Sequence, residues 1–357
     1  MSMAAWTWLL PALSFALLIG GMVAGVGSLL AVICAAALIG AVIAAVHHAE
    51  VIAHRVGEPF GTLILAVAVT IIEASLILSL MLAGGADTAA LPRDTIYAAI
   101  MIICNGVVGL CVLVGALAHC EQSFRAEGVS AGLAALIAMS AFSLVLPVFT
   151  TTTAGGTYST GQLAFAAITS AALWAVYVFT QTVRHRDYFL PPADASSPDA
   201  HAVPPTNPET WASFGLLIVS LVSVVGLAKL LSPLIEQLVE QAGAPKAVIG
   251  IVIAMLVLLP ETWAAVRAAH ANRLQTSMNL ALGSALASIG LTIPVVAVAS
   301  VVLGIPLILG LGPKDLVMLA VTFLLSVVTL ATGRTHMMQG AVHLVVFAAF
   351  LFLAFVP

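Results

Sequence analysis

The sequence predicts an all-α polytopic membrane protein of about eleven transmembrane helices, in which a first helix precedes two inverted five-helix repeats. Composition is the first observation: 62% of the 357 residues are hydrophobic, 7% are charged, and the mean hydropathy is +1.18. Soluble domains contain about 25% charged residues, so most of this surface is suited to lipid. The second observation is the spacing of long apolar segments. The third is an acidic residue inside one apolar segment of each half.

The apolar segments follow one another with short polar, glycine or proline breaks between them. A spanning helix needs about 20 mostly apolar residues, and dividing the chain at these breaks gives eleven segments. The N-terminal stretch lacks the basic start and the cleavage site of a signal peptide, so we expect an uncleaved first span. The expected helices cover approximately residues 6–25, 28–53, 59–83, 95–118, 129–150, 162–183, 211–240, 246–268, 274–303, 315–332 and 337–356.

One long polar interval, residues 185–210, separates the two halves of the chain. It contains Pro191-Pro192 and Pro204-Pro205, and such a composition cannot bury a core. We expect a first helix at 1–26, an N-terminal repeat at 27–184, a cytoplasmic linker at 185–210 and a C-terminal repeat at 211–357. Because five is odd, two such repeats in series insert with opposite orientations, and inverted repeats place substrate sites near the midplane.

The basic residues predict how the chain is oriented. Cytoplasmic loops are enriched in Lys and Arg, and a cytoplasmic N-terminus puts seven basic residues inside and three outside. The inner residues are Arg55, Arg125, Arg184, Arg186, Arg267, Arg273 and Arg334, and the outer ones are Arg93, Lys246 and Lys314. We therefore expect a multi-pass protein of the bacterial cytoplasmic (inner) membrane with a periplasmic C-terminus.

Two glutamates lie deep in apolar segments, Glu73 in the first half and Glu261 in the second. Each follows a glycine- and proline-containing helix start, Gly57-Glu-Pro-Phe-Gly61 or Gly243-Ala-Pro-Lys246, by about fifteen residues, or roughly 20 Å along a helix. A charge at that depth costs at least about 2.5 kcal/mol. The pair indicates a cation pathway. The alternative is a pair of protonated acids that hold helices together by hydrogen bonding.

The helix after each glutamate is rich in small and polar residues. These are Cys104-Asn-Gly106 in the first half and Gly283-Ser-Ala-Leu-Ala-Ser288 in the second. Small residues allow close helix contact, and amides or hydroxyls supply oxygen ligands. We therefore expect Thr70, Asn105 and Ser284 to support the glutamates, with interhelical hydrogen bonding as the alternative role.

Several motifs resemble bacterial calcium/proton antiporters of the cation/calcium exchanger superfamily, whose nearest branch also handles sodium and potassium. They are Gly57-Glu-Pro-Phe-Gly61 through Glu73, Leu259-Pro-Glu261, the segment from Asn272 to Gly290, Gly333-Arg-Thr, and Gln339-Gly-Ala-Val-His343. The resemblance implies two inverted five-helix repeats and exchange of a cytoplasmic cation for external protons. It matches Glu73 and Glu261 to the signature glutamates and Asn105 to a family asparagine. Where the family has Gly-Asn before each glutamate, this chain has Val69-Thr70 and Val257-Leu258.

The resemblance and the acids together predict a secondary transporter, not an enzyme, with Glu73 and Glu261 as shared metal-cation and proton sites. Calcium prefers six to eight oxygen ligands, and a cation and protons would compete for the same carboxylates. Export of cytoplasmic Ca²⁺ by alternating access is the first expectation. A sodium or potassium/proton antiporter is the alternative, and an intramembrane metalloenzyme or a channel is an alternative of another class.

Three polar residues at helical spacing, His47, Glu50 and His54, share one face of the second apolar segment. We interpret them as interfacial residues of a vestibule near the cytoplasmic side. A pH relay and a transition-metal site, as the metalloenzyme would require, are the alternatives. We expect no cofactor beyond the transported ions, no nucleic-acid partner, contact with membrane lipid, and compatibility with a homo-oligomer.

Overall fold

The computed structural model describes residues 5–25, 28–56, 60–84, 88–190, 205–241, 243, 245 and 247–356. The chain forms two compact units, each of which draws on both halves of the sequence. Unit 1 is Met1–Thr88 with Pro198–Ile249, and unit 2 is Ala89–Ser197 with Gly250–Pro357. The motif residues Gly57 to Pro59, Lys246 and linker residues 191–204 lie outside the described residues.

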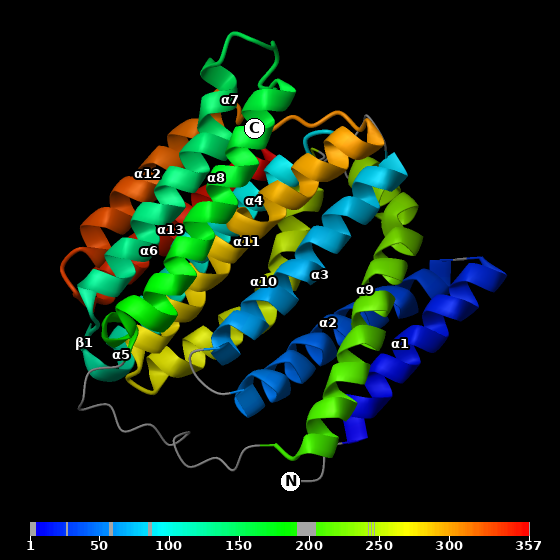
Figure 1. Ribbon diagram of the computed structural model, residues 1–357, viewed down its shortest axis with the longest axis horizontal. Coiled ribbons are helices and arrows are strands. Elements are labelled where there is room, and N and C mark those ends of the chain that lie inside the picture. The colour runs from blue at the N-terminus through cyan, green and yellow to red at the C-terminus, as the bar shows by residue number, and fades with distance from the viewer. Residues whose placement is uncertain are drawn as a thin grey trace. The chain divides into compact units, whose positions relative to one another are not determined.

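Unit 1 contains four long helices: α1 (Ala5–Ala24), α2 (Ser28–Val56), α3 (Phe60–Gly84) and α9 (Asn207–Gln241). The helix α2 packs against the other three, and α9 also contacts α1 and α3 (Figure 1). Small residues allow this packing: a Cβ on Gly226 of α9 would lie 2.5 Å from the Leu18 side chain. The hydroxyl of Ser14 donates to the Ala37 carbonyl oxygen, which joins α1 to α2.

Unit 2 contains the remaining helices, several of which are continuous spans made of two or three labelled pieces. Its elements are α4 (Leu91–Met101), the π-helical turn η2 (Ile102–Val107), α5 (Val108–His119), β1 (Glu121–Ser123), α6 (Ala126–Ser140), η3 (Ala141–Val145), α7 (Leu146–Phe149), α8 (Thr160–Phe179), η4 (Thr180–Arg184), η5 (Arg186–Phe189), α10 (Ala247–His270, with its first turn in unit 1), α11 (Leu274–Leu303), α12 (Pro313–Leu330), β2 (Arg334–His336) and α13 (Met337–Phe355).

The described helices confirm an all-α polytopic membrane protein. Ten described segments are long and apolar enough to cross a membrane, and α3 contributes a shorter apolar stretch, Val67–Leu82. Their bounds agree with the expected segments to within a few residues; for example, the expected 129–150 corresponds to Ala126–Phe149. The described parts of the expected linker are more regular than its composition suggests, since η5 and the start of α9 lie within residues 185–210.

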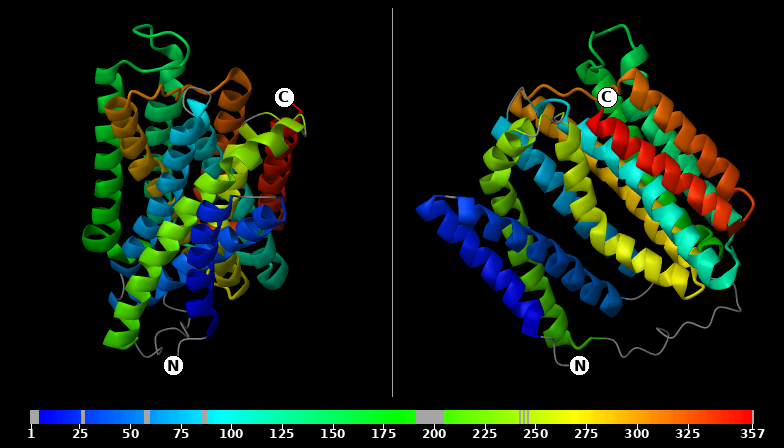
Figure 2. Two further views of the ribbon diagram at one scale, coloured as in Figure 1. Left: turned by 90° about the vertical axis from the view of Figure 1, so that its right-hand side faces the viewer. Right: turned by 180° about the vertical axis from the view of Figure 1, so that it is seen from behind.

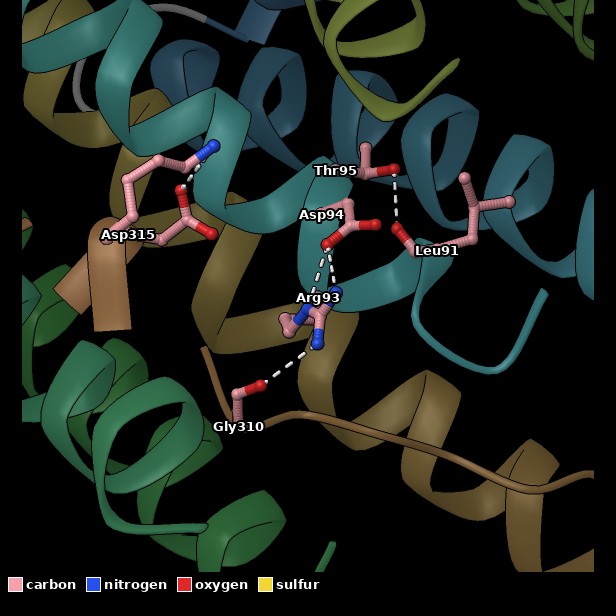
Figure 3. Close-up of polar contacts among 7 residues, drawn as sticks. Leu91, Arg93, Asp94, Thr95, Gly310 and Asp315 are labelled. Carbon is pink, nitrogen blue, oxygen red and sulfur yellow. Dashed lines mark hydrogen bonds and ion pairs between the residues drawn. The ribbon is translucent and has the colours of Figure 1, made fainter. Parts of the chain in front are cut away.

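Polar contacts join the loops between helices at two ends of unit 2. At the start of α4, the Arg93 guanidinium pairs with Asp94 at 2.7 Å and donates to the Gly310 carbonyl oxygen at 3.0 Å (Figure 3). At the other end of α5, β1 pairs antiparallel with β2. Gln122 of β1 donates to the carbonyl oxygen of Ala269 and to Asn272 Oδ1. This ribbon, which the sequence did not suggest, therefore fixes the turn between α10 and α11.

Candidate functional site

Glu261 lies on α10 at the edge of a small cavity within unit 2. Two hydroxyl side chains, Thr262 and Ser284, share this lining with apolar Ile103, Val107, Leu258 and Ala281. Glu261 is partly buried, and Ser284 is 7% exposed. Pro260 precedes the acid inside the helix, and proline removes one backbone hydrogen bond of the preceding turn. The lining therefore brings together one acidic residue, two hydroxyl residues and the proline-containing turn of α10.

Ser284 reaches the cavity that Glu261 lines because of how α10 and α11 pack. The Ser277 hydroxyl donates to the Ala265 carbonyl oxygen at 2.7 Å, so these positions face each other. Ser284 lies seven residues, or two turns, beyond Ser277 on the same face. Glu261 lies one turn before Ala265. Because α10 and α11 run antiparallel, moving back along α10 from Ala265 corresponds to moving forward along α11 from Ser277. Ser284 and Glu261 thus line the same cavity, and the role of Ser284 as a supporting ligand stays a prediction.

Asn105 occupies a different place from the one its role as a ligand would require. Its neighbours Ile103 and Val107 line the cavity, and a residue midway between them points to the opposite side of the helix. The Asn105 amide nitrogen donates to Thr322 Oγ1 at 2.8 Å, and its oxygen lies 3.2 Å from His343 Nδ1. The structure therefore places Asn105 in a contact between helices on the far side of the cavity wall.

Glu73 lies in unit 1 on α3, and its side chain is 2% exposed. Thr70, one turn before it, is 4% exposed, so the two residues share a buried face. The surrounding α3 positions are apolar, and the buried ones include Val69, Ile72 and Ile77. Each unit thus contains one of the two intramembrane glutamates, together with a hydroxyl residue on the same helix.

The polar residues on one face of α2 differ in their surroundings: one packs against a ring and two are exposed. His47 packs against the Trp6 ring with 4.8 Å between ring centroids, while Glu50 and His54 are exposed. The neighbouring His48, which the sequence analysis did not select, is buried with Nε2 2.9 Å from the Thr7 carbonyl oxygen. Within the described ranges there is no group of three or more His, Cys, Asp or Glu that could hold a metal ion.

Sequence reasoning missed a buried polar stripe on α12. Thr322, Ser326 and Thr329 are each at most 1% exposed and repeat at spacings of four and three. That spacing puts them on one helix face. In a spanning helix, a stripe of hydroxyl residues marks the face directed away from lipid, and this period was visible in the sequence.

The comparisons with known proteins agree with this architecture. The sequence profile of the sodium/calcium exchanger protein family matches residues 26–183 and 212–356. The chain is 48% identical over 355 residues to the putative ionic transporter y4hA of Sinorhizobium fredii, covering 99% of this chain and 96% of that protein. It is 37% identical to the sodium-potassium/proton antiporter ChaA of Escherichia coli, covering 87% and 84%. The Ca(2+)/H(+) antiporter of Aphanothece halophytica is 25% identical, covering 70% and 71%.

Solved structures show the same fold at lower sequence identity. The structure of native YfkE matches with a TM-score of 0.72 at 19% identity and covers 98% of this chain and 100% of that one. The H+/Ca2+ exchanger CAX matches with a TM-score of 0.75 at 14% identity, covering 97% and 87%. These matches make the protein a multi-pass secondary transporter of the cation/proton exchanger type and not an enzyme. The chain belongs to the sodium/calcium exchanger protein family.

Proposed function

We propose that this protein exchanges a cytoplasmic cation for external protons by alternating access, with Glu73 and Glu261 as shared cation and proton sites. The observation that supports this most strongly is the cavity that Glu261 lines together with Thr262 and Ser284, next to Pro260 inside the same helix. Intramembrane acids that face a cavity mark ion pathways. A cation and protons then compete for one carboxylate, and this competition couples their movements.

The backbone around Pro260 contributes a further oxygen to this proposal. Proline has no amide hydrogen, so the carbonyl of Leu256, four residues earlier, lacks its usual helical donor. Freed carbonyls at membrane depth are tolerated where a polar cavity is nearby. The same turn contains Leu258 and Glu261, both of which line the cavity. We infer that carbonyl oxygens of this turn assist the side-chain ligands.

Sodium or potassium is the substrate class that we favour. A monovalent cation needs one carboxylate to balance its charge, and among the described residues Glu261 is the one acidic residue that lines the unit 2 cavity. Calcium has twice the charge and usually binds more carboxylates. The 37% identity to a sodium-potassium/proton antiporter supports the same choice. Calcium, the first expectation from the sequence, remains the second candidate because calcium/proton antiporters are also relatives.

The arrangement of basic residues in unit 2 supports the proposed orientation. Arg93 and Lys314 lie where α4 and α12 begin, and Arg93 contacts the connection that leads to α12. At the opposite ends of these spans, Arg125 bonds to Gln275 through its backbone, and Arg334 pairs with Glu121. We propose that the first group faces the periplasm and the second the cytoplasm of the bacterial inner membrane.

Exchange in everted membrane vesicles tests the proposed function. Wild-type protein should dissipate a preformed proton gradient when sodium or potassium is added, and calcium should have a smaller effect. Glu73→Gln and Glu261→Gln should each abolish this response. Glu127→Gln is the matched control, because Glu127 is exposed in the first turn of α6. Activity in either intramembrane variant would contradict the shared-site mechanism, and a response only to calcium would reverse the ion assignment.

A further inference from the structure

A second polar cluster is buried in unit 2, on the far side of the cavity wall. We call it the histidine network; its four members come from η2, α12 and α13 and are each at most 1% exposed: Asn105, Thr322, Thr329 and His343. The ring of His343 joins two of them, with Nδ1 3.2 Å from Asn105 Oδ1 and Nε2 3.1 Å from Thr329 Oγ1. Burying polar groups is unfavourable unless they are hydrogen-bonded, and here they bond to one another.

The direction of each hydrogen bond follows from the atoms involved. An amide oxygen only accepts, so His343 Nδ1 carries the hydrogen and donates to Asn105. Nε2 of the neutral ring then accepts from the Thr329 hydroxyl. Thr322 Oγ1 accepts from the Asn105 amide and donates to the Met318 carbonyl oxygen at 2.8 Å. The Asn105 amide is therefore held at its oxygen by His343 and at its nitrogen by Thr322.

Close helix packing brings His343 to Asn105. A Cβ on Gly340 of α13 would lie 2.6 Å from the Leu113 backbone nitrogen, and one on Gly109 of α5 would lie 2.9 Å from the His343 Cβ. Glycines at such contacts let two helices approach backbone to backbone. Figure 2 shows α5, α12 and α13 side by side, in agreement with their contacts. The histidine network thus depends on the close packing of α5 against α13.

Asn105 does not line the Glu261 cavity, but its neighbours Ile103 and Val107 do. It lies within the six-residue π-helical turn η2, from which Ile103 and Val107 project into the cavity lining. A π-turn is rare, and such turns concentrate at functional sites. Holding the Asn105 side chain from behind fixes the rotation of this turn, and with it the two apolar side chains that face the cavity.

We propose that His343 is a positioning residue for the cation site: its Nδ1–H holds Asn105, and Asn105 holds η2 against the Glu261 cavity. This inference rests on the proposed function of Glu261. His343 does not itself touch the cavity. Because cavity size and ligand number select among cations, losing the bond should alter cation affinity and preference more than the maximal rate of exchange.

Three substitutions at His343 separate this role from simple packing. The amide nitrogen of an asparagine lies close to the position of Nδ1, so His343→Asn retains the donor to Asn105. His343→Gln reaches toward Thr329 instead, and His343→Leu retains bulk without any polar atom. For each, we would measure the cation KM and maximal rate in proteoliposomes, and the rise in melting temperature of the purified protein as sodium, potassium or calcium is added.

The expected result is a cation KM near the wild-type value for His343→Asn and a KM raised roughly three- to tenfold for His343→Leu and His343→Gln, the equivalent of one lost buried hydrogen bond. The added-cation stabilisation should weaken in the same order. Equal KM in all variants, or a His343→Asn protein as impaired as His343→Leu, would overturn the proposal. If His343→Leu does not fold, the Asn and Gln pair decides.

Two reference proteins distinguish this proposal from the proposed function. Wild-type exchange together with an inactive Glu261→Gln variant would support Glu261 as the site, whatever the His343 variants do. Exchange by Glu261→Gln would contradict the proposed function alone. In that case the melting shifts still test whether His343 affects cation binding. A loss of those shifts in His343→Leu but not in His343→Asn supports the positioning role.

Discussion

The two glutamate-bearing helices, α3 and α10, place their acids alike but prepare the surroundings differently. In α10 the proline lies in the acidic helix itself, where Pro260 precedes Glu261 without interrupting the helix. The 25-residue α3 contains no proline, and the irregularity lies in the helix that follows it, as the π-turn η2 around Asn105. The proline-containing turn of α10 therefore has no counterpart in α3. In the proposed function the two glutamates share a task although the residues around them differ.

Among substitutions that retain both glutamates, the largest expected effect comes from replacing the proline inside α10. Pro260→Ala restores a helical amide donor, and proline in a helix interior costs about 3 kcal/mol relative to alanine. We expect a more stable protein with at least about tenfold slower exchange, since a carbonyl freed by proline would again be bonded. Melting temperature and exchange rate check this.

Pro294→Ala is the matched control for that substitution, because Pro294 also lies inside a spanning helix, α11. It should change stability with little effect on exchange. If Pro260→Ala exchanged cations as fast as the wild type, the proline in α10 would have no role in binding, and the contrast with α3 would be purely structural.

The next largest effect is expected where α13 packs against α5, the contact that brings His343 to η2. Gly340→Ala places a methyl group 2.6 Å from a backbone atom, and overpacking of this kind costs about 1–3 kcal/mol. We expect a lower melting temperature and a raised cation KM. Gly161→Ala is the control, since a Cβ there meets no atom within 4 Å. Equal behaviour of the two variants would show that the α5–α13 crossing can relax.

A smaller effect should follow from removing one hydroxyl at the cavity. Ser284→Ala deletes a neutral oxygen from the cavity that Glu261 lines, and we expect a roughly two- to fivefold rise in cation KM, the size of one modest polar contact. Ser288→Ala, one turn further along α11, should leave KM unchanged. The reverse order of effects would place the cation one turn higher on α11 than we propose.

The smallest effect is expected at the exposed face of α2. Replacing Glu50 by Gln or His54 by Ala should change exchange less than about twofold at neutral pH, because exposed charges are screened within about 8 Å at physiological salt. A vestibule role predicts a change mainly in salt dependence. A shift of the whole pH profile by His54→Ala would instead favour the pH-relay interpretation of His47, Glu50 and His54.

Much of the fold was predictable because the length and hydropathy of a segment identify a spanning helix. All eleven apolar segments correspond to described helices, and Glu261 and Ser284 line one cavity. Interhelical hydrogen bonding by Asn105 was one of its two expected roles, but its partners were not predictable in this way. Helical periodicity assumes regular turns, and only the structure reveals the π-turn at Ile102–Val107 and the partner His343, which lies 238 residues further along the chain.

The grouping of helices into compact units was not part of the sequence prediction. The expected repeats are continuous segments and stay a prediction, and each compact unit combines parts of both halves. Contacts between α2 and α9, for example, join helices on either side of the 185–210 interval. Such long-range packing depends on which faces carry small residues, such as Gly226 against Leu18. A list of apolar segments does not specify that choice.

The most direct test of the central claim is proton release on cation binding, measured on purified protein in weakly buffered detergent solution. If protons and cations compete for Glu261, adding sodium or potassium at a pH where the carboxyl is protonated should release protons from the wild type. Glu261→Gln should release fewer, and Glu127→Gln should match the wild type. Equal proton release from wild type and Glu261→Gln would contradict the account, because the exchanged proton would then come from another group.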